Sequence, residues 1–281
     1  MLCDLHTHSN FSDGTATPAE IVAEAVQAGL AAVALTDHNT ARGLPDFISA
    51  AEKNNIIPVP GVEFSVDYEG TELHLLGLFI KPEHFPAVEE LMQEGARRKE
   101  ESNLALIEAL SDAGIKLDYA EIKGKTPGGQ VNRAHIATAM MEAGYVGSVK
   151  EAFRSYLSKT GGFYKEPQRI SVWQMLEFIN SIGAVSVLAH PFLNLTDEEL
   201  EILLPKAKEA GLVGMECYYS LYDEVTTADS LALAEKFGLL PSGGSDYHGE
   251  RKPGINVGVG FGNLSIPYKW CEELKRSASN M

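Results

Sequence analysis

The chain has 281 residues, of which 44% are hydrophobic and 22% charged, so it is long enough and apolar enough to bury a sizeable core. The net charge of −16 at pH 7 excludes extended, non-specific binding of duplex nucleic acid over most of the surface. No run of about 18 apolar residues predicts a membrane span, and no signal peptide is visible. Three widely spaced cysteines, Cys3, Cys217 and Cys271, exclude a disulfide framework, and we expect a cytoplasmic protein.

Apolar runs alternate with amphipathic stretches in the first part of the chain, which is typical of repeated β-α units. Thr17 and Pro18 predict a helix start, because they supply an N-cap and a proline at the first helical position, and Gly29 follows the expected end. The predicted elements are a strand at 2–5, a helix at 18–28, a strand at 31–35, a helix at 45–54, a strand within 56–66 and a strand at 72–80.

The alternation stops after Pro82 and resumes at about residue 172. Between them the sequence predicts a long charged helix at 85–114 and shorter helices at 133–143 and 149–157. After them come a helix at 172–182, a strand at 184–188, a helix at 197–210, a strand at 213–218, a helix at 228–237 and an apolar run at 239–241. We therefore expect one domain made of residues 1–82 and 167–281, and an inserted helical domain at 83–166.

The first candidate metal site is His6-Thr7-His8, which is followed by Asp13. Residues i and i+2 of a strand point the same way, so both imidazoles lie on one face of the chain, as a chelated metal requires. From this motif alone, a pair of surface histidines near the terminus is an equally open interpretation.

Most of the eight histidines fall in or at the ends of predicted strands. They are His6, His8, His38, His74, His190 and His248, whereas His84 and His135 lie elsewhere. Taken singly, His74 is predicted to be a hydrogen-bonded core histidine, and Glu63 a solvated acid. Together with Asp13 and Asp246 at matching positions, they favour a metal centre, because strand ends of a parallel barrel converge on one rim.

The chain resembles the PHP (polymerase and histidinol phosphatase) family of phosphoesterases in motifs that run through it in order. The motifs are Asp4-Leu5-His6-Thr7-His8 with Asp13, Thr36-Asp37-His38, Gly61-Val62-Glu63-Phe64-Ser65, His74, Ala189-His190-Pro191 and Gly244-Ser245-Asp246-Tyr247-His248. The resemblance implies an α/β fold, a distorted seven-stranded (β/α) barrel, which here carries the small helical insertion. It also implies a cluster of two to three divalent metal ions.

The resemblance assigns a ligand set to each expected ion. His6, His8, Glu63 and Asp246 hold the first, Glu63 with His74 and His190 the second, and Asp13, His38 and His248 the third. Imidazole and carboxylate donors without thiolates suit manganese, zinc or iron, and donor type does not choose among them. Three such ions and three carboxylates leave a charge of about +3, which attracts phosphate. We expect Asp4 and Asp37 either to orient histidine rings or to be ordinary loop acids.

These residues predict a metal-dependent phosphoesterase in which a metal-bound hydroxide attacks phosphorus. Glu63 and His190 would act at the reacting centre, and Asp246 would shuttle the proton, with a metal-bound water as the alternative. The resemblance favours nucleotide substrates, as in nucleoside 3',5'-bisphosphate phosphatases or 5'-to-3' exonucleases on short RNA. Histidinol phosphatase is the rival activity, and a non-catalytic metal-binding module is the rival class. We expect a small phosphorylated substrate and no membrane, and the sequence leaves the oligomeric state open, with a monomer favoured.

The insertion carries the candidate substrate-binding residues. Asn132 is a plausible N-cap, which places Arg133 and His135 in the first turn of a helix, where unpaired N–H groups favour anions. The nucleotide-acting relatives have Arg-Pro-His here, so Ala134 departs from their pattern while both expected phosphate contacts remain. Lys159 and Tyr164 are weaker candidates for the same pocket, and a solvated helix start is the plain alternative.

Overall fold

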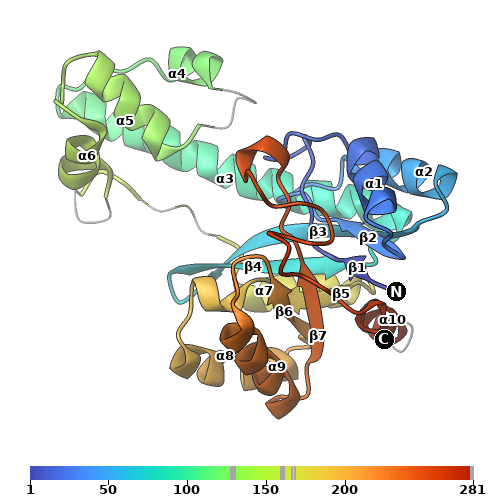
Figure 1. The fold of residues 1–281 in the computed structure, drawn as a ribbon. Helices are drawn as coiled ribbons and strands as arrows, with labels where there is room; N and C mark the ends of the chain where they lie inside the picture. The colour runs from blue at the N-terminus through green and yellow to red at the C-terminus, as the bar shows by residue number, and fades with distance from the viewer. Residues whose placement is uncertain (127–130, 159–161, 166, 168, 279–281) are drawn as a thin grey trace. The chain divides into compact units, whose positions relative to one another are not determined.

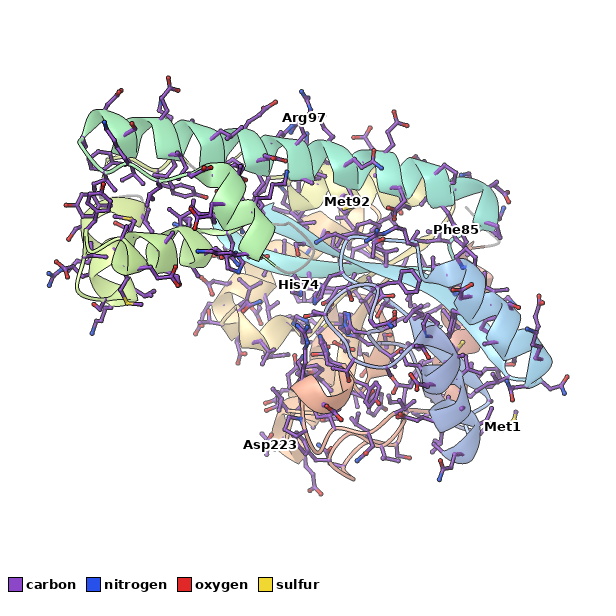
Figure 2. The ribbon with its side chains drawn as sticks, turned by 90° about the horizontal axis from the view of Figure 1, so that it is seen from above. Met1, His74, Phe85, Met92, Arg97 and Asp223 are labelled. Carbon is purple, nitrogen blue, oxygen red and sulfur yellow. The ribbon has the colours of Figure 1, made fainter. Side chains whose placement is uncertain are left out.

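The structure is a computed structural model that describes residues 1–126, 131–158, 162–165, 167 and 169–278. It divides into two compact units, one of Met1–Glu90 with Ile170–Met281 and one of Leu91–Arg169. Helix α3 (Phe85–Asp112) is continuous across the first division, as Figure 2 shows along Phe85, Met92 and Arg97. No helix within the described ranges is both long and apolar enough to cross a membrane.

The first unit is built on one seven-stranded sheet in which the strands follow each other in chain order. They are β1 (Cys3–Asp4), β2 (Ala32–Leu35), β3 (Ile57–Tyr68), β4 (Thr71–Leu78), β5 (Val185–Leu188), β6 (Gly214–Tyr219) and β7 (Leu240–Gly244). Backbone hydrogen bonds from Leu5 N to Gly243 O, 3.0 Å, and from Asp246 N to His6 O, 2.8 Å, connect the two ends of the sheet. The predicted α/β barrel is therefore confirmed.

Helices cover the outside of this sheet (Figure 1). They are α1 (Pro18–Gln27), α2 (Leu44–Lys53), α7 (Val172–Ser181), α8 (Asp197–Glu209), α9 (Glu224–Lys236) and α10 (Tyr268–Ala278), with short 3-10 turns η1 (Pro82–His84), η5 (Pro191–Leu193) and η6 (Gly249–Arg251). Thr17 caps α1 as expected, in a capping box with Glu20. Helix α10 was not predicted; it buries Cys271 and Leu274 against the barrel core.

The sheet differs from an all-parallel barrel at β4, which is antiparallel to both β3 and β5. Its cause is the short connection between β3 and β4, where Glu69 and Gly70 both have positive φ, of 52° and 90°. Such a two-residue turn forms a hairpin, whereas a parallel connection needs a crossover of a dozen or more residues. As a result, His74, near the start of β4, pairs in register with Ser65 near the end of β3.

Glycine allows β7 to approach β1 closely. A Cβ atom added at Gly244 would lie 2.2 Å from the Cβ of His6, which is inside van der Waals contact. Any larger residue would therefore push His6 out of place. The glycine of the Gly244-Ser245-Asp246 motif thus lets the end of β7, two residues before Asp246, lie directly against His6, which follows β1.

The second unit is helical throughout its described elements. After α3 it contains α4 (Tyr119–Lys125), α5 (Arg133–Glu142), α6 (Val149–Ala152) and a π-helical turn, η3 (Phe153–Leu157). These elements share a core of their own, which includes Leu106, Leu110, Ile136, Met140 and Leu157. The unit therefore has the packing of an independent small domain.

Candidate metal centre

One buried carboxylate, that of Glu63 on β3, lies at the centre of the predicted ligands. It is fully buried, as are His6 and His8. Five ring nitrogens lie within 3.2 Å of its oxygens: His6 Nε2 (3.1 Å), His8 Nε2 (3.1 Å) and His38 Nδ1 (3.2 Å) of Oε2, and His74 Nδ1 (2.8 Å) and His190 Nε2 (3.0 Å) of Oε1. Figure 2 labels His74 on this part of the sheet. Barrel closure thus gathers histidines from the whole length of the chain around one acid.

His6 and His8 face each other through their Nε2 atoms, which are 3.0 Å apart. Asp246 Oδ1 is 3.7 Å from the first of these atoms and 3.3 Å from the second. Two histidine nitrogens on a tetrahedral zinc ion, each about 2.0–2.1 Å from the metal, are separated by roughly 3.3 Å. The spacing therefore suits two rings that direct their lone pairs at one cation.

A second group of ligands lies beside the first, around Asp13. Its Oδ1 is 3.3 Å from His248 Nε2 and 3.8 Å from His8 Nδ1, and its Oδ2 is 3.9 Å from His38 Nε2. Asp13 is 44% exposed at its side chain, so this group opens towards solvent, unlike the buried Glu63 group. His8 contributes one ring nitrogen to each group and so connects them.

The donor set fits divalent metal ions. Four overlapping groups of histidine and carboxylate atoms have all their atoms within 4.8 Å: His6, Glu63 and His190; His6, His8 and Asp246; His38, Glu63 and His74; and His8, Asp13, His38 and His248. Three atoms of this set, Glu63 Oε2, His8 Nδ1 and His190 Nδ1, are buried without a hydrogen-bond partner in the described structure. Such orphaned polar atoms are costly unless a cation or water satisfies them. The cluster is therefore able to bind metal.

The backbone around the cluster is held in sparsely populated conformations. His190, Asp246 and Asn39, the neighbour of His38, have positive φ values of 28°, 55° and 53°. Non-glycine residues adopt this region when the surrounding structure forces them to, and such residues gather at functional sites. Two of the expected ligands are thus aimed by strained backbone at the ends of β5 and β7.

Sequence reasoning missed Glu216 on β6, and of the two roles left open for Asp4 and Asp37, the structure supports that of hydrogen-bonded loop acids. Asp4 accepts hydrogen bonds from the backbone N–H groups of His6, Ser245 and Gly258. Asp37 accepts from Ser9 and Ser12. Both acids hold loops, because their short side chains bond the nearby backbone. Glu216 is the buried acid that reaches a ring, His6 Nδ1, at 3.2 Å.

Asp246 has two further partners that the sequence motifs did not reveal. Its Oδ2 accepts hydrogen bonds from the hydroxyl of Tyr219, 2.7 Å, and from the ammonium of Lys252, 2.5 Å. Tyr219 also lies against the ring of His190, with centroids 5.3 Å apart. One oxygen of Asp246 thus faces the histidines while the other is held by two donors.

The charges of the cluster shift the pKa values of its members. Burial lowers the pKa of His6, but the carboxylates of Glu63, Glu216 and Asp246 overcome this and raise it well above its ordinary value. Burial lowers the pKa of His74, but the hydrogen bond to Glu63, 2.8 Å, and the Glu72 carboxylate, 3.9 Å from Nε2, outweigh this and raise the pKa to about 9. Burial would raise the pKa of Glu63, yet its histidine neighbours hold it well below the usual range. Without metal, His6 and His74 therefore bind protons where cations would be, whereas burial lowers the pKa of His38 to about 4.

The candidate substrate residues lie in the second unit. Asn132 caps α5, and His135 Nδ1 accepts a hydrogen bond from the Asn132 N–H at 3.1 Å, which completes a capping box. Arg133 stacks its guanidinium on the ring of Tyr164, 4.1 Å from the centroid, and donates to Leu157 O at 3.0 Å. Lys159 lies outside the described residues. Arg133 and Tyr164 thus contact each other, while His135 serves as a cap.

Comparison with known proteins gives consistent relatives. The family model for the PHP domain matches residues 4–210. The chain is 32% identical over 250 residues to the 5'-3' exoribonuclease of Haemophilus influenzae, covering 87% of this chain and 89% of that one. It is 30% identical to the 3',5'-nucleoside bisphosphate phosphatase of Chromobacterium violaceum, covering 91% and 90%. A solved structure from Bifidobacterium adolescentis, described as a candidate metal-dependent phosphoesterase, has a TM-score of 0.69 and 25% identity, covering 98% and 96%.

The barrel, the buried histidine and carboxylate cluster and these similarities define the class of protein. It is a metal-dependent phosphoesterase, an enzyme that hydrolyses phosphate esters. The chain belongs to the PHP domain family.

The raised pKa values predict that metal and protons compete for the cluster. Below a pH of about 9, His74 binds a proton in the metal-free chain. A ligand must be deprotonated, so manganese binding should release protons and the apparent affinity should rise with pH, by about tenfold per pH unit for each proton displaced. Calorimetric titration with manganese at pH 6.5 and 8.5, in buffers of different ionisation enthalpy, measures both quantities. Equal affinity at the two pH values with no proton release would contradict this account.

Proposed function

We propose that the protein hydrolyses phosphate esters of nucleotides, either as a nucleoside 3',5'-bisphosphate 3'-phosphatase or as a 5'-to-3' exonuclease on short oligonucleotides. The observation that carries the proposal is the buried Glu63 carboxylate, whose oxygens contact ring nitrogens of five histidines. The nucleotide substrate rests on the two relatives at 32% and 30% identity, named as an exoribonuclease and a nucleoside bisphosphate phosphatase.

The proposal includes two to three divalent ions, of manganese, zinc or iron. His6, His8 and Asp246 would hold one ion, His74 and His190 a second, Glu63 both of these, and Asp13, His38 and His248 a third. Bound ions of this kind polarise a phosphoryl oxygen and lower the pKa of a coordinated water. Their positive charge also explains how a chain of net charge −16 attracts an anionic substrate.

The protein's own residues then position the reacting groups. Glu63 and His190 contact each other at 3.0 Å and are buried, so their side chains have little freedom to move within the site. Asp246 stays our candidate for the proton shuttle, although its pKa lies well below its ordinary value. Burial raises this pKa, but the effect of His6 and His8, which lower it, is larger. For Asp246 to carry a proton on Oδ2, either Tyr219 or Lys252 must first leave that oxygen.

We further propose that the insertion expected at 83–166 sets substrate choice. Its Arg133 presents a planar guanidinium that is held from one side by Tyr164, which keeps the fork in a fixed plane. A guanidinium of this kind can bond two phosphate oxygens at once, which a lysine ammonium does not imitate. Arg133 would read a second phosphate on the substrate, remote from the ester that is cleaved.

The proposed activity predicts phosphate release, with manganese or zinc added, from adenosine 3',5'-bisphosphate or nucleotide release from a 5'-phosphorylated short RNA. Glu63→Gln should lower kcat by more than about 100-fold, beyond the ~10–100-fold typical of groups outside the ligand sphere, since an amide coordinates cations weakly. Glu201→Gln, which removes a surface carboxylate paired with Lys236, is the control and should keep full activity. A dominant rate on histidinol phosphate would overturn the substrate assignment.

The role of Arg133 predicts a substrate-dependent loss. Arg133→Ala should lower kcat/KM at least about tenfold, or about 1.4 kcal/mol, on a substrate with a second phosphate, and much less on a simple aryl phosphate. Arg133→Lys should recover little of the loss, because it keeps the charge but not the fork. Equal losses on both substrates would mean that Arg133 supports the fold instead of reading a phosphate.

A further inference from the structure

Glu216 is a buried acid that none of the recognised motifs contains. It lies in β6 between Met215 and Cys217, is fully buried, and pairs in register with Ser242 of β7. A carboxylate is rarely buried to this extent unless it is paired or fully hydrogen-bonded. The hydrogen-bond partners of Glu216 therefore indicate its role.

The carboxylate of Glu216 contacts two residues, one that follows β1 and one that follows β5. Nδ1 of the His6 ring, just after β1, lies 3.2 Å from Oε1 and 3.4 Å from Oε2. Oε2 accepts a hydrogen bond of 2.8 Å from the backbone N–H of His190, just after β5. One carboxylate thus ties together two residues that are 184 positions apart in the chain and that both contact Glu63.

The hydrogen bond to His6 decides which ring nitrogen carries the proton. Glu216 is an acceptor, so it favours the proton on Nδ1 and leaves the Nε2 lone pair free. That Nε2 atom points into the cluster, 3.0 Å from His8 Nε2 and 3.1 Å from Glu63 Oε2. The ring is thereby held with its donor nitrogen directed at the place where a cation would lie.

The bond to His190 acts on the backbone. His190 has a φ of 28°, a conformation that a non-glycine residue leaves unless its surroundings hold it. Its N–H group is anchored by Glu216, and its Nε2 atom lies 3.0 Å from Glu63 Oε1. The same acid therefore stabilises the strained turn that aims the second ring.

We propose that Glu216 is a positioning residue of the metal centre, which fixes the tautomer of His6 and the backbone of His190 at the same time. The inference rests on the proposed roles of His6 and His190 as metal ligands. The positioning role requires a side chain with two acceptor oxygens and the length of glutamate. Glutamine fails because its NH2 group must face either the His6 ring nitrogen or the His190 N–H, and aspartate fails because it is one methylene too short to reach both.

The test measures zinc binding by the full-length chain, by competition with a chromophoric chelator. Glu216→Gln should weaken binding by about 10–100-fold, the usual effect of a group that orients a metal ligand. Glu216→Asp keeps the negative charge and should also weaken binding by at least about tenfold. Wild-type affinity in Glu216→Asp would show that charge alone matters and would overturn the positioning role, as would affinity within about threefold of wild type in Glu216→Gln. If Glu216→Gln does not fold, the zinc affinity of Glu216→Asp alone decides between the positioning role and an effect of charge.

Ser242→Ala is the matched control, since Ser242 is buried opposite Glu216 and its hydroxyl has no hydrogen-bond partner within the described part of the chain. It should leave zinc affinity unchanged, and an equal loss there would mean that any change in this strand pair loosens the site. Nitrogen-15 NMR of the zinc-loaded chain should show a proton on His6 Nδ1 that is lost or exchanges faster in Glu216→Gln. A chain that binds zinc in this Glu216-dependent way but releases no phosphate would leave the inference standing and remove the proposed function.

Discussion

The structure depends on the burial of one negative charge, that of Glu63, among the rings of histidines from distant parts of the chain. A carboxylate removed from water needs opposite charge or hydrogen bonds nearby, and its cost is several kcal/mol when they are absent. Here the imidazoles of His6 and His8 approach one oxygen, and those of His74 and His190 the other. Fold and site are therefore coupled, because the barrel brings these rings together and the cluster in turn needs cations or protons to be stable.

The strand arrangement explains how this coupling is achieved. Parallel strands deliver side chains to one rim at their carboxyl ends, but His74 belongs to a strand that runs in the opposite direction. The two-residue turn at Glu69 and Gly70 returns the chain at once, so that β4 begins near the rim where β3 ends. Strained residues at the ends of β5 and β7, His190 and Asp246, complete the set. The distortions of the barrel thus serve the metal centre.

Much of this was predictable from the sequence, because the expected ligands occur in short motifs at the ends of apolar runs. The structure brings all nine of them into one cluster, whereas their assignment to particular ions stays a prediction. The β3–β4 hairpin was not predicted, although the few residues between the two expected strands leave no room for a crossover. Helix α10 was missed because Cys271 and Leu274 supply too short an apolar pattern among charged neighbours.

The partners of the ligands were harder to predict. Glu216 carries a signal, a lone acid within the buried strand Gly214–Tyr219, but its contacts with His6 and His190 depend on barrel closure. Tyr219 and Lys252 belong to no motif either, and they meet at Asp246 only through the tertiary structure. For Asp4 and Asp37 the sequence left two roles open, because they are close to histidines in sequence, and in the structure they bond loop atoms.

The central claim is that the Glu63 cluster is a multinuclear metal centre. Anomalous X-ray diffraction from crystals of the metal-loaded chain, collected on both sides of the zinc or manganese absorption edge, tests it most directly. The account predicts two to three anomalous peaks among the nine ligands, with the carboxylate of Glu63 between two of them. A fully loaded crystal with no peak within coordinating distance of Glu63 would contradict it.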